Sequence, residues 1–82
     1  MQPQPVYPAR SRKANEQGTV VAKVLIDPAG RPAQVQLQKS AGYPALDDAA
    51  LSAVRAAHFR PYVENGVPQP VWVLAPIRFA LQ

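Results

Sequence analysis

Very few side chains in this sequence are of the types that carry out covalent chemistry. The 82 residues include no cysteine and one histidine, His58. A catalytic triad needs a nucleophile, a base and a group that orients the base, and His58 has no cysteine or acidic residue close to it in sequence. The lack of cysteine also excludes thiolate metal sites. We therefore expect a protein that is not an enzyme and needs no metal or cofactor, with His58 as a capping or surface residue.

The adjacent carboxylates Asp47 and Asp48 are the other candidates for acid-base chemistry. Neighbouring positions on a helix point about 100° apart, so the two side chains would not converge on one substrate atom. Their position at the start of a helical pattern has a simpler explanation, because carboxylates cap free amides there and oppose the helix dipole. We interpret both residues as helix caps.

Charge suggests a partner more than a reaction. Nine Lys and Arg against five Asp and Glu give a net charge of +4, which favours an anionic partner such as nucleic acid, a phospholipid surface or an acidic protein segment. A nucleic-acid-binding domain would present base-stacking aromatic residues on its sheet, whereas this chain has Gln34, Gln36 and Gln38 in a predicted strand. That class is therefore the alternative. The basic cluster Arg10, Arg12 and Lys13 is either a solvated face or a contact site.

The elements that would position these residues form one domain. Its hydrophobic pattern predicts an α+β fold in the order α-β-β-α-β, with two helices packed on one face of a small antiparallel sheet of three strands, or of four as the alternative. Asp27-Pro28-Ala29-Gly30 predicts the hairpin turn and Asn65-Gly66 a later turn. The predicted ranges are a short helix over 9–16 begun by Pro8, strands over 19–26 and 32–40, a helix over 46–57 and a last strand over 71–81.

Two faces of these elements are expected to be buried. On the second strand, Ala33, Val35 and Leu37 alternate with the glutamines and should pack on the helices. Phe59 and Tyr62 are expected to plug the end of the interface between helix and sheet. The long helix carries an apolar stripe at helical spacing, formed by Leu46, Ala49, Ala50, Ala53, Val54 and Ala57.

Pro76 marks the last strand as a sheet edge, because a proline inside a strand cannot donate to a neighbouring strand. Backbone groups alternate sides along a strand, so Trp72, Leu74, Arg78 and Ala80 should share the outward direction of Pro76. This leaves a row of free donors and acceptors that an extended peptide could use by β-augmentation. Trp72 is either a binding anchor or a cover for the second face of the sheet.

The order and spacing of several short motifs resemble the C-terminal domain of TonB-type energy transducers, including HasB-like members. The resemblance spans nearly the whole chain. It rests on Gln4-Pro5-Val6-Tyr7-Pro8-Ala9-Arg10, Gly18, Asp27-Pro28-Ala29-Gly30, Ser40-Ala41-Gly42, Leu46-Asp47-Asp48-Ala49-Ala50, Phe59-Arg60-Pro61 and Pro76-Ile77-Arg78-Phe79. Two features differ from the family: polar residues fill the first helix, and His58 stands where relatives often have tryptophan.

The resemblance implies a periplasmic domain of a protein anchored in the inner membrane outside this sequence. Residues 1–6 would end a Pro-rich spacer, and residues 7–82 would form the receptor-binding domain. Its partners would be the TonB box and plug of outer-membrane receptors, together with ExbB/ExbD-type motor proteins of the inner membrane. The function would be to couple proton-motive energy to uptake of iron-siderophore, haem or similar substrates, with no nucleic acid partner.

The resemblance and the strand parity together give a set of candidate receptor-binding residues. By resemblance, the N-terminal segment contacts the receptor plug, with Arg10 as the partner of a receptor carboxylate. A related envelope adaptor with a different peptide partner is a further alternative. We expect a monomer that can pair edges or exchange elements at high concentration. The candidate residues are Gln4, Tyr7, Pro8, Arg10, Trp72, Leu74, Arg78 and Ala80.

Overall fold

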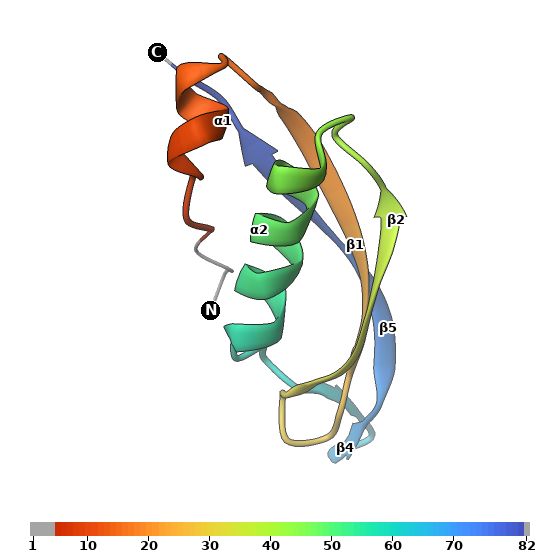
Figure 1. Ribbon diagram of the computed structural model, residues 1–82. Helices are drawn as coiled ribbons and strands as arrows, with labels where there is room; N and C mark the ends of the chain where they lie inside the picture. The colour runs from red at the N-terminus through yellow and green to blue at the C-terminus, as the bar shows by residue number, and fades with distance from the viewer. Residues whose placement is uncertain (1–4, 82) are drawn as a thin grey trace.

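Two helices lie on one face of a three-stranded antiparallel sheet, in a computed structural model that describes residues 5–81 (Figure 1). The strand order is β2-β1-β5, which confirms the predicted fold class and the position of the last strand at an edge. A separate two-stranded sheet, β3-β4, was not predicted. The elements are α1 (Ala9–Lys13), β1 (Gly18–Ile26), β2 (Pro32–Lys39), α2 (Pro44–Ala56), β3 (Tyr62–Glu64), β4 (Val67–Gln69) and β5 (Val71–Phe79).

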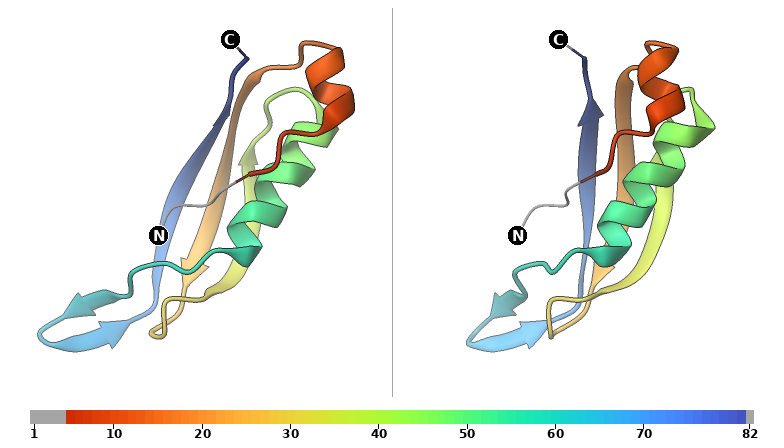
Figure 2. Two further views of the ribbon diagram at one scale, coloured as in Figure 1. Left: turned by 90° about the vertical axis from the view of Figure 1, so that its left-hand side faces the viewer. Right: turned by 60° about the vertical axis from the view of Figure 1, so that its left-hand side comes forward.

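The core lies between α2 and the helix-facing side of the sheet (Figure 2). Alternate residues of β1 are buried, as the period of a half-buried strand requires, and the apolar stripe of α2 covers them. Small side chains on α2 let the helix approach the sheet closely. The buried core residues are Val20, Ala22, Val24, Ile26, Leu46, Ala50, Val54, Ile77 and Phe79.

The β1–β2 turn forms as predicted and has a second role. The Asp27 carboxylate accepts hydrogen bonds from the backbone N–H groups of Ala29 (2.9 Å) and Arg31 (2.8 Å). Gly30 adopts a φ of +85°, and a Cβ placed there would lie 2.2 Å from the carbonyl oxygen of Phe59. The Phe59 N–H donates to the Gly30 carbonyl at 2.8 Å. The turn therefore also fastens the segment that follows α2.

The start of α2 corrects the interpretation of Asp47. The N-cap residue Tyr43 makes no side-chain capping hydrogen bond, and Asp47 points back into the preceding turn. Its carboxylate accepts hydrogen bonds from the Ser40 hydroxyl and from the Ala41 N–H (2.9 Å). Asp47 is buried, so these partners compensate for its lost hydration. Asp47 thus closes the loop between β2 and α2, whereas Asp48 is exposed.

Helix α1 is shorter than predicted. It ends at Lys13 because Asn15 adopts a left-handed φ of 56°, which stops the helical repeat. Pro8 is its N-cap residue and Ser11 is its buried residue. The Ser11 hydroxyl has no hydrogen-bond partner among the described residues. The polar composition noted in the sequence therefore includes one buried hydroxyl without a hydrogen-bond partner among residues 5–81.

Strand β2 packs less well than its alternation predicted. Val35 lies against the core, but Ala33 is exposed and 44% of Leu37 remains accessible. The prediction for Ala33 and Leu37 was wrong because β2 is itself an outer strand of the sheet. Its pairing with β1 shifts register in two places, between Val21 and Ala22 and between Leu25 and Ile26.

The β3–β4 hairpin turns at Asn65 and Gly66, whose φ values of 53° and 77° are those of a two-residue hairpin turn. Both views of Figure 2 show this hairpin projecting past β5, on the side away from β1. Tyr62 is exposed in β3, so its predicted role as a plug was wrong, and its hydroxyl lies 3.2 Å from the Glu64 carboxylate. Of the two predicted plug residues, Phe59 packs against the core and Tyr62 does not.

Candidate peptide-binding edge

Strand β5 has β1 on one side and no strand on the other among residues 5–81. Nine consecutive residues of β5 pair with β1 without a register shift, from Gly18 opposite Phe79 to Ile26 opposite Val71. The free side of β5 is thus a straight row of backbone groups, roughly 30 Å long at the rise of an antiparallel strand.

The pairing of Pro76 with Val21 fixes which residues face this free side. A hydrogen-bonded antiparallel pair exchanges two N–H···O bonds, which proline cannot do, so Val21 and Pro76 form a non-hydrogen-bonded pair. Because the two kinds of pair alternate, the backbone groups of Trp72, Leu74 and Arg78 also point away from β1. This agrees with the parity predicted from the sequence.

The side chains of these outward residues lie on the sheet face that no helix covers. Trp72 is 42% exposed, Leu74 is 59% exposed, and Arg78 is exposed. The Lys23 ammonium lies 5.1 Å from the centre of the Trp72 ring, within the range of a cation–π contact. Trp72 therefore covers part of the second face and still presents ring surface to solvent, and its role as a binding anchor stays a prediction.

All charged side chains of the three-stranded sheet are positive. The residues of β1, β2 and β5 include Lys23, Lys39 and Arg78 and no carboxylate. Lys23 was not among the predicted site residues. Its position opposite Leu74, next to Trp72, depends on the β1–β5 register, and only its unusual place in an apolar strand was visible in the sequence. A segment arriving at this edge would meet positive charge on a partly apolar surface.

The N-terminal segment does not lie free beside this edge. Tyr7 packs edge-to-face against Phe79, with ring centres 5.3 Å apart, and its hydroxyl donates to the Glu16 carbonyl. The Arg12 guanidinium lies 5.4 Å from the centre of the same ring. Tyr7 is thus partly committed to the fold, which sequence reasoning missed because the contact joins residues far apart in the chain.

The remaining predicted residues are spread over two surfaces. Pro8 is half-buried, and exposed Arg10 lines a hollow of about 200 Å³ with Glu16, Pro44 and Ala45. Neither residue lies on the β5 edge, so the structure brings Trp72, Leu74 and Arg78 together but not the N-terminal group with them. Gln4 lies outside the described residues. Contact of any of these residues with a receptor stays a prediction.

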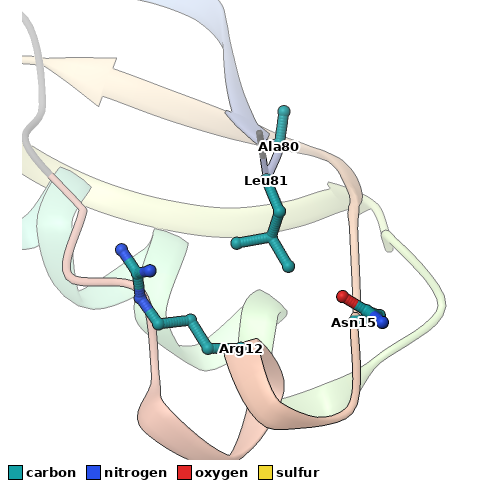
Figure 3. Close-up of a pocket in the computed structure, with 4 residues that line it drawn as sticks. All are labelled: Arg12, Asn15, Ala80 and Leu81. Atoms are coloured by element: carbon teal, nitrogen blue, oxygen red, sulfur yellow. The ribbon is translucent and has the colours of Figure 1, made fainter.

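Ala80 follows the end of β5 and lines a larger hollow of about 520 Å³ with Arg12, Asn15 and Leu81 (Figure 3). The Leu81 side chain points into this space, toward the side of Arg12 and Asn15 (Figure 3). The Leu81 N–H donates to the Gln17 side-chain oxygen at 3.0 Å. The hollow is therefore shaped by the α1–β1 connection and lies at the Arg78 end of the free edge.

Residues 5–81 contain neither a cluster suited to a metal ion nor a helix suited to a membrane span. No three His, Cys, Asp or Glu side chains gather there closely enough to hold a metal ion. Across the same stretch, no helix has both the length and the apolar character needed to cross a bilayer. His58 is exposed, two residues past the end of α2.

Comparison with known proteins shows the family of this chain. A model described as Gram-negative bacterial TonB protein C-terminal matches residues 3–81. The chain is 40% identical over 81 residues to the protein TonB of Vibrio cholerae serotype O1, covering 99% of this chain and 33% of that protein. It is 39% identical over 79 residues to the protein tonB2 of Pseudomonas aeruginosa, covering 96% and 29%.

A third relative, the protein TonB of Neisseria meningitidis serogroup C, is 45% identical over 58 residues, covering 71% of this chain and 21% of that protein. The chain thus spans no more than about a third of the length of these relatives. The family model and two of these relatives cover nearly all of the present chain, as the sequence resemblance does. This chain belongs to the family of Gram-negative bacterial TonB protein C-terminal domains.

Proposed function

We propose that this chain is the receptor-binding domain of a TonB-type energy transducer and that it grips an extended segment of an outer-membrane receptor at the free side of β5. One observation carries the proposal: a nine-residue strand with regular pairing on one side and free backbone groups on the other. Long exposed edges promote aggregation, and natural proteins usually shorten, charge or cover them. A physiological partner strand would account for this edge.

The geometry supports β-augmentation by a strand of mixed character. Outward N–H and C=O groups of Trp72 and Leu74 would pair with the incoming backbone, which supplies affinity without regard to side chains. Side chains of the incoming residues that pair with them would lie on the helix-free face, beside the Trp72 ring and Leu74. Lys23 and Arg78 on that face favour a segment that carries carboxylates.

The wider role follows from the family and is part of the proposal. The domain would work in the periplasm as part of a protein that is anchored in the inner membrane outside this sequence. ExbB/ExbD-type motor proteins would supply proton-motive energy, and the docked receptor would use it to import iron-siderophore, haem or a similar substrate. Tyr7, Pro8 and Arg10 would contact the receptor plug at a surface other than the β5 edge.

The test is an NMR titration of the ¹⁵N-labelled domain with peptides copied from the periplasmic N-terminal segments of outer-membrane receptors. Shifts should concentrate on the outward amides of β5, at Trp72, Leu74 and Arg78. Shifts confined to the helices, or tighter binding of single-stranded DNA with steep salt dependence, would contradict the proposal.

A pair of proline variants separates the two edges of the sheet. Leu74→Pro removes one outward N–H from β5, and we expect peptide affinity to fall about tenfold or more because a ladder bond is lost and the proline ring obstructs the strand. Leu37→Pro makes the same change on the free side of β2 and should leave affinity unchanged. Thermal unfolding of both variants checks that each is folded.

A further inference from the structure

The free edge of β5 has an internal gap, and the inference drawn from it rests on the proposed function. Outward N–H donors occur in β5 at Trp72, Leu74 and Arg78, but Pro76, between the last two, has none. Pro70 directly before the strand also lacks an N–H. The row of donors thus begins at Trp72 and is interrupted once.

Any strand that docks here must leave one of its own carbonyl groups without a strand donor. In antiparallel pairing this is the carbonyl of the residue opposite Pro76, and in parallel pairing it is the carbonyl one residue earlier. The proline ring occupies the place where an N–H would stand, so the gap is also steric. The carbonyl of Pro76 itself points outward and can still accept a hydrogen bond.

The number of hydrogen bonds lost at the gap differs between a foreign strand and a second copy of this chain. A foreign segment without proline loses one ladder hydrogen bond. A second copy of this chain, paired through its own β5 about a two-fold axis, brings a second Pro76, so two carbonyl groups lack donors. Each unmade bond lowers affinity, and self-pairing is therefore penalised twice.

We propose that Pro76 is a specificity-determining residue that makes the β5 edge selective for a foreign strand over a second copy of the same domain. The exposed, apolar character of Trp72 and Leu74 would otherwise favour pairing between copies. The foreign partner loses one hydrogen bond, because one of its carbonyl groups finds no N–H donor in an otherwise complete ladder.

An ester scan of a probe peptide tests the gap directly. The probe is acetyl-Glu-Thr-Val-Thr-Val-Thr-Val-Thr-Glu-amide, with a single backbone ester moved along it. Each ester weakens one carbonyl acceptor and removes the N–H on the opposite side of the peptide group, which faces solvent when that carbonyl faces β5. Dissociation constants come from titrations followed by the β5 amide shifts.

Four carbonyls of the probe, spaced two residues apart, would face Trp72, Leu74, Pro76 and Arg78. With the wild-type domain, an ester should weaken binding at the carbonyls that face Trp72, Leu74 and Arg78. An ester at the carbonyl that faces Pro76 should leave affinity unchanged. Each loss should be roughly 2- to 10-fold, the effect of one net hydrogen bond. In Pro76→Ala the third carbonyl should become as sensitive as the others. Pro68→Ala, a matched exposed proline in β4, should retain the wild-type pattern.

Self-association gives the second readout. If Pro76→Ala tightens binding of the all-amide probe by a given factor, its dimerisation constant measured by sedimentation equilibrium should rise by about the square of that factor, because two gaps are repaired. Sensitivity at all four carbonyls in the wild type, or equal factors for probe and dimer, would overturn the inference. Absence of probe-induced shifts on β5 would instead overturn the proposed function on which it rests.

Discussion

The two outer strands of the sheet, β2 and β5, both have a free side within residues 5–81, yet different interactions hold them in place. Strand β2 is fastened at its ends, by the Asp27–Gly30 turn before it and by Asp47 after it. Strand β5 is held along its length, because Val71, Val73 and Ala75 pack against the core, Ile77 and Phe79 are buried, and its pairing has no register shift. A strand pinned at its ends tolerates bulges, whereas one packed along its length stays straight enough to template another strand.

Removing core bulk from β5 should have the largest effect on stability. Phe79→Ala is expected to lower the free energy of unfolding by about 3 to 5 kcal/mol, since it removes a buried ring and its contact with Tyr7. Urea denaturation measures the loss. Leu37→Ala on β2 is the control and should cost less than about 1 kcal/mol because that side chain is 44% exposed and does not belong to the core cluster. Equal losses would show that the two strands are held alike.

Blocking the turn before β2 should come next. Gly30→Ala is expected to cost about 3 kcal/mol, because the left-handed φ disfavours alanine and its Cβ would collide with the Phe59 carbonyl. Gly66→Ala is the matched control: its φ is +77° but nothing lies within 4 Å of the added Cβ, so about 1 kcal/mol is expected. Equal costs for the two variants in urea denaturation would remove the argument for a clash.

Releasing the other end of β2 should have a smaller effect. Asp47→Ala is expected to cost about 1 to 3 kcal/mol, because the hydrogen bonds that the buried Asp47 carboxylate accepts from the Ser40 hydroxyl and the Ala41 N–H are both lost. Asp48→Ala, one residue later and exposed, should change stability by less than about 0.5 kcal/mol. If Asp48→Ala proved the more costly, helix capping would be restored as the role of this pair.

Low pH should slightly reduce the stability that the Asp27 turn before β2 contributes. The backbone N–H of Arg31, with help from Ala29 and the Arg31 guanidinium, holds the pKa of Asp27 below its ordinary value of 3.8. A lowered pKa in the folded state means that the stabilisation is complete above pH 3.8 and is lost as pH falls through the folded value. The stability difference between the wild type and Asp27→Asn should therefore shrink below pH 3.8. A difference that stays constant down to pH 2 would contradict this linkage.

The sequence predicted best those features that depend on near neighbours in the chain. Pro76 alone was enough to place β5 at an edge and to give the outward direction of Trp72 and Leu74, because strand parity is strictly local. The Asp27–Gly30 turn followed from the φ preferences of its residues. The alternation of β1 and the stripe of α2 likewise identified the core.

What the sequence missed depends on register and on contacts between distant segments. The Lys23–Trp72 contact exists only because Leu25 pairs with Trp72 and Lys23 with Leu74. Asp47 has a competing partner in Ser40 that is seven residues away, and a helix-capping rule has no knowledge of it. The β3–β4 pairing joins strands of three residues, too short for alternation to be detected.

Tyr7 gives the fold a direct mechanical link. Its ring rests on Phe79, so the stretch of chain that begins at Pro5 touches the strand proposed to hold the partner. Tension applied ahead of Pro5 would act on β5 through this ring contact and on the α1–β1 connection through the bond from the Tyr7 hydroxyl to the Glu16 carbonyl. The proposed docking strand would thus bear part of such a load directly, without an intervening element.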